Sequence, residues 1–107
     1  MTQTASRQKR VGLHLPLEVD GRDAGGAKFS ETTRTLNVSG GGLAFETVRD
    51  LPMGSRLDLV VELPPPLRHR FGGKAEYSVR AVVCRVERNQ GSAISRVGVR
   101  FLGEIPG

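Results

Sequence analysis

Apolar residues alternate with polar ones along several short stretches of the chain, and no long 3.6-residue apolar period appears between them. Leucine or valine occupies every second position from Leu13 to Val19, which indicates a strand with one buried face. The alternation returns at Leu57–Leu63 and at Val97–Phe101. This period of two excludes a helical fold and predicts a chain built from β-strands.

Six stretches carry strand patterns, and turns rich in glycine, asparagine or proline separate them. The predicted strands cover residues 13–20, 29–38, 43–47, 56–63, 75–88 and 93–102. Short strands without a clear helix predict an all-β fold, either a sandwich or a six-stranded antiparallel β-barrel. We favour the barrel because closure removes exposed strand edges.

Several details of these elements are also predicted from the residues. Pro16 has no backbone N–H, so the first strand is expected at an edge or with a bulge. Apolar residues fill both phases of 75–88, which indicates a bulge or burial on both faces. The proline-rich segment 64–74 is expected to be a loop, 48–51 is the only candidate for a helical turn, and 103–107 is expected to fray.

The length and the cysteine count limit the class of protein. The 107 residues support one domain with a modest core, and a single cysteine excludes an intramolecular disulfide. No apolar run approaches the roughly 18 residues that span a bilayer, so no membrane insertion is expected. Residues 1–6 are polar, without the apolar centre of a signal peptide, and a cytoplasmic location is expected. Whether the chain is a fragment of a longer protein stays open.

The positive charge is concentrated in two segments. The net charge is +5, but residues 1–10 carry +3 and residues 67–88 carry +4, while residues 18–62 carry −3. Most of the cations are arginines, whose planar fork suits phosphates and guanine edges. This asymmetry favours an anionic partner, although a solvated basic surface would have the same composition.

Catalytic and metal-binding patterns are absent from the sequence. His14, His69 and Cys84 have no metal-ligand spacing, and Cys84 lies in an apolar strand, where a small core residue is the simplest interpretation. No phosphate-cradling Gly-x-x-x-x-Gly-Lys occurs. We therefore expect no enzyme, no metal and no cofactor.

Two segments remain as candidates for binding. Residues 6–10 form a basic arm that contains Arg7 and Arg10 and precedes the first strand. Such an arm is either a cationic tail or an element that wraps an anionic ligand. Residues 37–42 (Asn-Val-Ser-Gly-Gly-Gly) are either a plain hairpin turn or a site where a ligand approaches the backbone.

In this order the two segments resemble the PilZ domain family, whose fingerprint is an Arg-x-x-x-Arg arm followed by [Asp/Asn]-x-Ser-x-x-Gly. Asn37, Ser39 and Gly42 fit the second motif in full. The flanking segments 42–45 (Gly-Leu-Ala-Phe) and 97–101 (Val-Gly-Val-Arg-Phe) are similar too, so the resemblance covers nearly the whole chain.

The resemblance implies a PilZ-like β-barrel over residues 11–103 with a flexible basic arm over residues 1–10. It also implies a bacterial, non-enzymatic receptor that binds the second messenger cyclic di-GMP and signals by ordering the arm. A protein partner or a neighbouring domain would read that change. The ligand-binding residues that it implies are Arg7, Arg10, Asn37, Ser39 and Gly42.

The arm departs from the family pattern. Ser6 stands four residues before Arg10, where the family has its first arginine, and Arg7 lies one residue late. A slip of one residue in an extended chain turns a side chain to the opposite face. Binding of cyclic di-GMP and its stoichiometry therefore stay open at this point.

Two other functions are weighed against the receptor. One is a degenerate PilZ adaptor that binds a protein without cyclic di-GMP. The other is a basic barrel for RNA or single-stranded DNA, which needs exposed aromatic side chains for stacking. This chain has five aromatic residues, most of which look like core, so nucleic acid is disfavoured. Arg34 and Arg100, on strands near the motifs, are lesser candidates for ligand contact.

Overall fold

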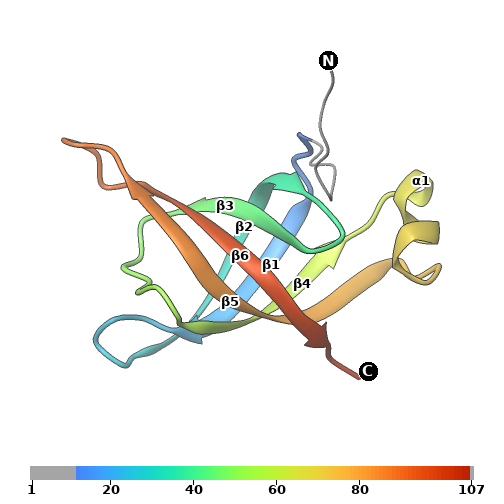
Figure 1. The fold of residues 1–107 in the computed structure, drawn as a ribbon, viewed down its shortest axis with the longest axis horizontal. Coiled ribbons are helices and arrows are strands. Elements are labelled where there is room, and N and C mark those ends of the chain that lie inside the picture. The colour runs from blue at the N-terminus through green and yellow to red at the C-terminus, as the bar shows by residue number, and fades with distance from the viewer. Residues whose placement is uncertain (1–11, 107) are drawn as a thin grey trace, which may run out of the picture.

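The computed structural model describes residues 12–106 and consists of six antiparallel strands closed into a barrel (Figure 1). Around the barrel the order is β1-β2-β3-β6-β5-β4, and β4 pairs back with β1. The predicted all-β barrel is confirmed. The strands are β1 (Pro16–Arg22), β2 (Lys28–Val38), β3 (Gly42–Thr47), β4 (Arg56–Glu62), β5 (Glu76–Arg88) and β6 (Ser95–Glu104).

The barrel interior is filled by alternate residues of all six strands, as the period of two requires. These side chains are almost all aliphatic, and burial of each contributes roughly 1.5–3 kcal/mol. Phe45 is the only aromatic side chain among the most deeply buried residues of the described chain. The inward-facing residues with at most 1% exposure include Leu17, Val19, Leu43, Phe45, Leu57, Leu59, Val61, Val79, Val83 and Val97.

The first strand is not an edge strand, contrary to the expectation from Pro16. Pro16 is the first residue of β1 and pairs only with Arg34 of β2, while the pairing of β1 with β4 begins at Leu17. A proline in the first position of a strand removes no ladder hydrogen bond. The chain therefore tolerates Pro16 within a closed barrel, and the strand starts three residues later than predicted.

The segment after β4 was expected to be a loop but contains two short helices, α1 (Pro65–Arg68) and η1 (His69–Phe71). Prolines are accommodated in the first turn of a helix, where the N–H groups have no intrahelical partner. Leu67 and Phe71 pack against the core. The ring of Phe71 lies 4.8 Å from that of Tyr77, which in turn lies 5.6 Å from that of Phe101.

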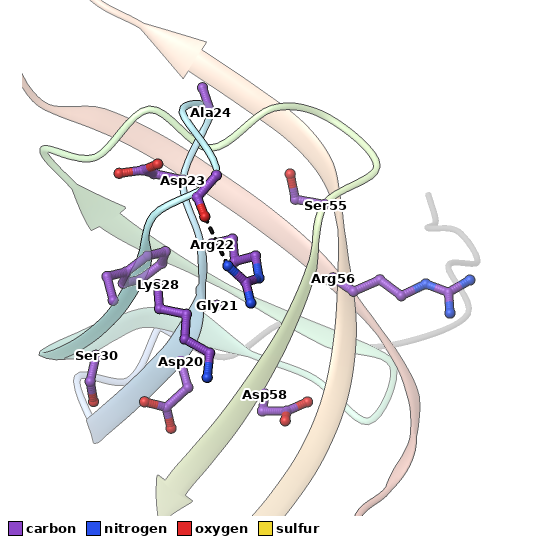
Figure 2. A pocket seen from close by; sticks show the side chains of 12 residues that line it. Asp20, Gly21, Arg22, Asp23, Ala24, Lys28, Ser30, Ser55, Arg56 and Asp58 are labelled. Carbon is purple, nitrogen blue, oxygen red and sulfur yellow. Dashed lines mark hydrogen bonds between the residues drawn. The ribbon is translucent and has the colours of Figure 1, made fainter.

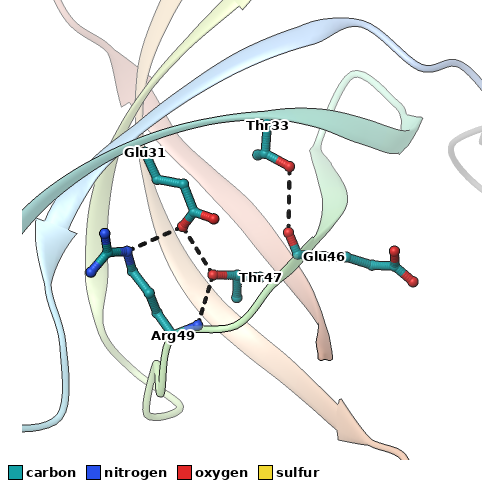
Figure 3. A network of polar contacts seen from close by, with 5 residues as sticks. All are labelled: Glu31, Thr33, Glu46, Thr47 and Arg49. Carbon is teal, nitrogen blue, oxygen red and sulfur yellow. Dashed lines mark hydrogen bonds and ion pairs between the residues drawn. The ribbon is translucent and has the colours of Figure 1, made fainter. Parts of the chain in front are cut away.

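The expected helical turn at 48–51 is wrong, and Figure 3 shows the contacts that form there instead. The buried Thr47 hydroxyl accepts a hydrogen bond from the Arg49 N–H at 3.0 Å and donates one to Glu31 at 2.9 Å. The Arg49 guanidinium pairs with Glu31 at 3.3 Å and lies 4.4 Å from the centre of the Phe29 ring. A threonine that bonds the backbone two residues ahead favours a turn over a helix.

Cys84 is exposed, so its predicted place in the core is wrong. The register of β5 against β6 shifts between Val83 and Arg85, which leaves Cys84 as the extra residue of a bulge. Its thiol reaches the Gly98 carbonyl at 3.5 Å. The expected bulge in 75–88 is thereby confirmed.

The C-terminal end of β6 is longer than predicted. The strand continues to Glu104, and the N–H of Ile105 donates to the Ser78 carbonyl at 2.8 Å. The segment from residue 103, which was expected to fray, is therefore paired with β5 at its start.

Candidate functional site

The Asn-x-Ser-x-x-Gly segment forms the turn between β2 and β3. The N–H of Ser39 donates to the Gly42 carbonyl at 2.8 Å, and the N–H of Gly41 donates to the Ser39 hydroxyl at 3.2 Å. The Ser39 hydroxyl also donates to the Gly42 carbonyl at 3.3 Å. Serine therefore holds this turn from within by bonding neighbouring backbone groups.

Gly42 is required by a close approach of the next strand. Its φ is not positive, so the turn itself does not demand glycine there. A Cβ at Gly42 would lie only 2.1 Å from the carbonyl oxygen of Val99 in β6. The neighbouring Gly41 carbonyl accepts a hydrogen bond from the Phe101 N–H at 2.9 Å. The turn is thus fastened to β6.

Asn37 reaches the outer face of the barrel through a bulge in β2. The register against β3 shifts between Thr35 and Asn37, and Asn37 is paired with Ala44. Thr35 and Val38 are both buried, so the inward phase changes from odd to even positions. Without that shift, Asn37 would face inward like Thr35, two residues before it. The sequence pattern gave no sign of this bulge.

The segment that leads into β1, residues 13–15, is fixed beside this turn. The buried Thr35 hydroxyl donates to the Leu13 carbonyl at 2.6 Å and accepts from the Leu15 N–H at 2.9 Å. The Thr35 N–H also donates to the Leu15 carbonyl at 2.9 Å, and Nδ1 of His14 lies 3.1 Å from the Thr35 carbonyl oxygen. The chain just before β1 is therefore held two residues away from Asn37.

The other two predicted binding residues, Arg7 and Arg10, lie outside the described residues. Of the predicted set, the structure brings Asn37, Ser39 and Gly42 together in one turn. The contribution of Thr35 was missed, although a threonine on the buried phase of a strand is a usable signal for a side-chain-to-backbone bond.

A large open pocket lies away from this turn. It has a volume of about 920 Å³ and lies between the β1–β2 hairpin and the start of β4 (Figure 2). Some of its polar groups are engaged locally: Asp23 accepts from the N–H groups of Gly25 and Ala27, and Asp58 pairs with Arg80 at 3.2 Å. A second cavity, of about 700 Å³, lies at the start of β1, between Leu15 and Arg68.

Tyr77 has a shifted pKa in the folded protein. Burial, and then the Glu104 carboxylate, raise the pKa of Tyr77 above its usual 10.0, while Lys74 acts in the opposite sense. Within residues 12–106 no three His, Cys, Asp or Glu side chains gather as a metal site. None of the helices in this range is long and apolar enough to cross a membrane.

These features define a small antiparallel β-barrel with a glycine-rich polar turn beside the segment that leads into β1. A sequence profile of the PilZ domain matches residues 5–106, and the chain belongs to the PilZ domain family. A search among curated proteins finds no significant match.

Three solved structures share the fold at low sequence identity. Bacillus subtilis MotI/DgrA, an inhibitor of motility, is 17% identical with a TM-score of 0.71, over 96% of this chain and 45% of that one. The PilZ domain of Escherichia coli YcgR with c-di-GMP is 18% identical with a TM-score of 0.61, over 92% and 79%. The K. pneumonia MrkH–c-di-GMP complex is 18% identical with a TM-score of 0.60, over 94% and 45%. The chain thus spans less than half the length of MotI/DgrA and MrkH.

Proposed function

We propose that the chain is a cyclic di-GMP receptor domain. Asn37, Ser39 and Gly42 form the barrel side of the site, and Arg7 and Arg10 of the arm complete it. The observation that carries the proposal is the set of hydrogen bonds by which Thr35 holds residues 13–15 beside the β2–β3 turn. Membership of the PilZ family and the likeness to two barrels with c-di-GMP support it.

The chemistry of these residue types suits a guanine dinucleotide. An arginine fork pairs with O6 and N7 of guanine or with two phosphate oxygens, and its plane stacks on a base. The amide of Asn37 and the hydroxyl of Ser39 add neutral polar groups at the turn. No bond is made or broken in this role. Ordering of the arm on the ligand is the signal that a neighbouring domain or partner protein reads.

Calorimetric titration of the full chain with cyclic di-GMP tests the proposal, with GTP and a short RNA as control ligands. We expect binding of cyclic di-GMP alone. Arg10→Ala removes a charge-assisted contact worth about 1.5–3 kcal/mol, so affinity falls at least tenfold. Arg70→Ala, an exposed arginine in η1, serves as the matched control and leaves affinity unchanged. No heat at about 100 μM protein, a concentration that detects even weak complexes, would refute the receptor function.

The one-residue slip of the arm has its own test. Ser6→Arg restores the family spacing to Arg10. Tighter binding by this variant shows that Arg7 reaches the ligand poorly, whereas unchanged affinity shows that Arg7 already serves.

Ser6 stands where the family pattern has its first arginine. This departure favours a second candidate function, a PilZ adaptor that binds a protein partner without cyclic di-GMP. The two functions separate in the same titration: the adaptor gives no heat with the dinucleotide. Its partner binding would also persist in Arg10→Ala.

A further inference from the structure

Two rows of side chains cross the outer face of the barrel near the turn, and their charges differ. In one row Arg96 of β6 is paired with Glu46 of β3 on one side and with Glu87 of β5 on the other. In the other row Arg100 of β6 is paired with Gly42 and Val82 on the same two strands. Arg96 thus has an acid on each side, whereas Arg100 has none.

The acidic residues nearest to the row of Arg100 form ion pairs with other cations. Glu104 pairs with Lys74, and Asp58 pairs with Arg80. Within the described chain Arg100 is exposed and makes no ion pair. Its row continues through Val82 to a second cation, Arg56 of β4, so the local potential is positive.

This uncompensated arginine stands directly beside the binding turn. Gly42, its neighbour on β3, has no side chain to project between Arg100 and the turn. The hydrogen bond from the Phe101 N–H to the Gly41 carbonyl fixes the backbone of β6 at this point. The backbone at Arg100 is therefore held in place by the pairing of β6 with β3, and this does not depend on the N-terminal arm.

We propose that Arg100 is a further ligand-binding residue. From its position on β6, paired with Gly42 of β3, its guanidinium binds a phosphate of cyclic di-GMP. The inference rests on the proposed function and adds a cation that belongs to the rigid barrel rather than to the arm. An exposed guanidinium with all donors available binds a phosphate bidentately. Because its strand is already ordered, this contact costs less conformational entropy than one made by the arm.

A titration with cyclic di-GMP compares two variants of the full chain. Arg100→Gln and Arg96→Gln remove the same charge from the same face of the same strand, four residues apart. We expect Arg100→Gln to weaken binding at least tenfold and Arg96→Gln by less than about twofold, because exposed charges without a ligand contact contribute little. Arg100→Lys keeps the charge without the fork and should fall between wild type and Arg100→Gln.

Two further readouts separate ligand contact from a structural role. Added NaCl should weaken binding less steeply in Arg100→Gln than in wild type, because one phosphate contact is missing. Thermal unfolding of both glutamine variants should match wild type. The residual affinity of Arg10→Ala should fall again when Arg100→Gln is added.

The outcomes distinguish the two proposals. Absence of binding by wild type overturns the receptor function and this inference together. Binding by wild type with equal affinities of Arg100→Gln and Arg96→Gln overturns the role of Arg100 alone. A drop in Arg100→Gln that comes with a lowered unfolding temperature and an unchanged salt dependence would make the residue structural, which also overturns the inference.

Discussion

Gly42 and Val99 approach so closely across the β3–β6 pair that a methyl group on Gly42 would lie 2.1 Å from the Val99 carbonyl oxygen. Gly42→Ala must therefore push the two strands apart. We expect its free energy of unfolding, measured by urea denaturation, to fall by about 1–3 kcal/mol, the range for an overpacked site. Affinity for cyclic di-GMP should fall as well, since the turn moves.

Gly40→Ala is the matched control in the same turn. Gly40 is exposed, its φ is not positive, and a Cβ there meets nothing within 4 Å. Its effect on unfolding should stay within about 0.5 kcal/mol. Equal destabilisation by the two alanines would contradict the steric role of Gly42.

Thr35→Val keeps the shape of a buried side chain and removes its hydroxyl. The N–H of Leu15 then loses its partner in a buried place, and the Leu13 carbonyl loses its donor. We expect a loss of about 1–3 kcal/mol in unfolding free energy. Thr32→Val, on the exposed face of the same strand, should change little.

The same variant tests whether the position of residues 13–15 matters for ligand binding. If Thr35 positions residues 13–15 beside the turn, Thr35→Val weakens ligand binding in titrations at a temperature where the protein is fully folded. Unchanged affinity in the destabilised protein would show that ligand binding does not depend on the hydrogen bonds of Thr35.

Tyr77 makes stability depend on alkaline pH. Its pKa is raised in the folded state, mainly by burial, above the ordinary 10.0 that it regains on unfolding. Between these two values the folded state holds more protons than the unfolded state, so stability falls as the pH rises through that window. Denaturation curves from pH 8 to about pH 11 should show a steeper fall for wild type than for Tyr77→Phe.

Parallel curves for the two proteins would contradict that account of Tyr77. A direct check is the absorbance of tyrosinate, which reports this residue alone because the chain has one tyrosine. Its midpoint should lie higher in the folded protein than in urea.

Cys84 should react with a thiol reagent in the native state. Because the bulge in β5 turns its side chain outward, folding should slow modification by less than about tenfold relative to protein in urea. Cys84→Ser should change the unfolding free energy by no more than about 0.5 kcal/mol, as for other exposed positions. Protection that requires global unfolding would contradict the exposed position.

The strands and the Asn-x-Ser-x-x-Gly turn were largely predictable because both depend on local patterns. Val97 and Val99 are inward as their alternation predicts, and the Ser39 turn follows from side chains that bond nearby backbone. Cys84 was misplaced and the outward position of Asn37 was not anticipated. In both cases a bulge adds one residue to the strand, so the inward and outward positions exchange beyond it. The alternation of apolar and polar residues in the sequence does not show where such a bulge lies.

By itself, the sequence determined that this chain is an all-β PilZ domain with an Asn-x-Ser-x-x-Gly turn after its second strand. Only the tertiary structure decided that Gly42 must be small, that Thr35 anchors the segment before β1, and that Arg100 lacks the acidic neighbours of Arg96. Each of these depends on which residue of a distant strand lies opposite. That register is set by barrel closure and bulges, which act between strands rather than along one.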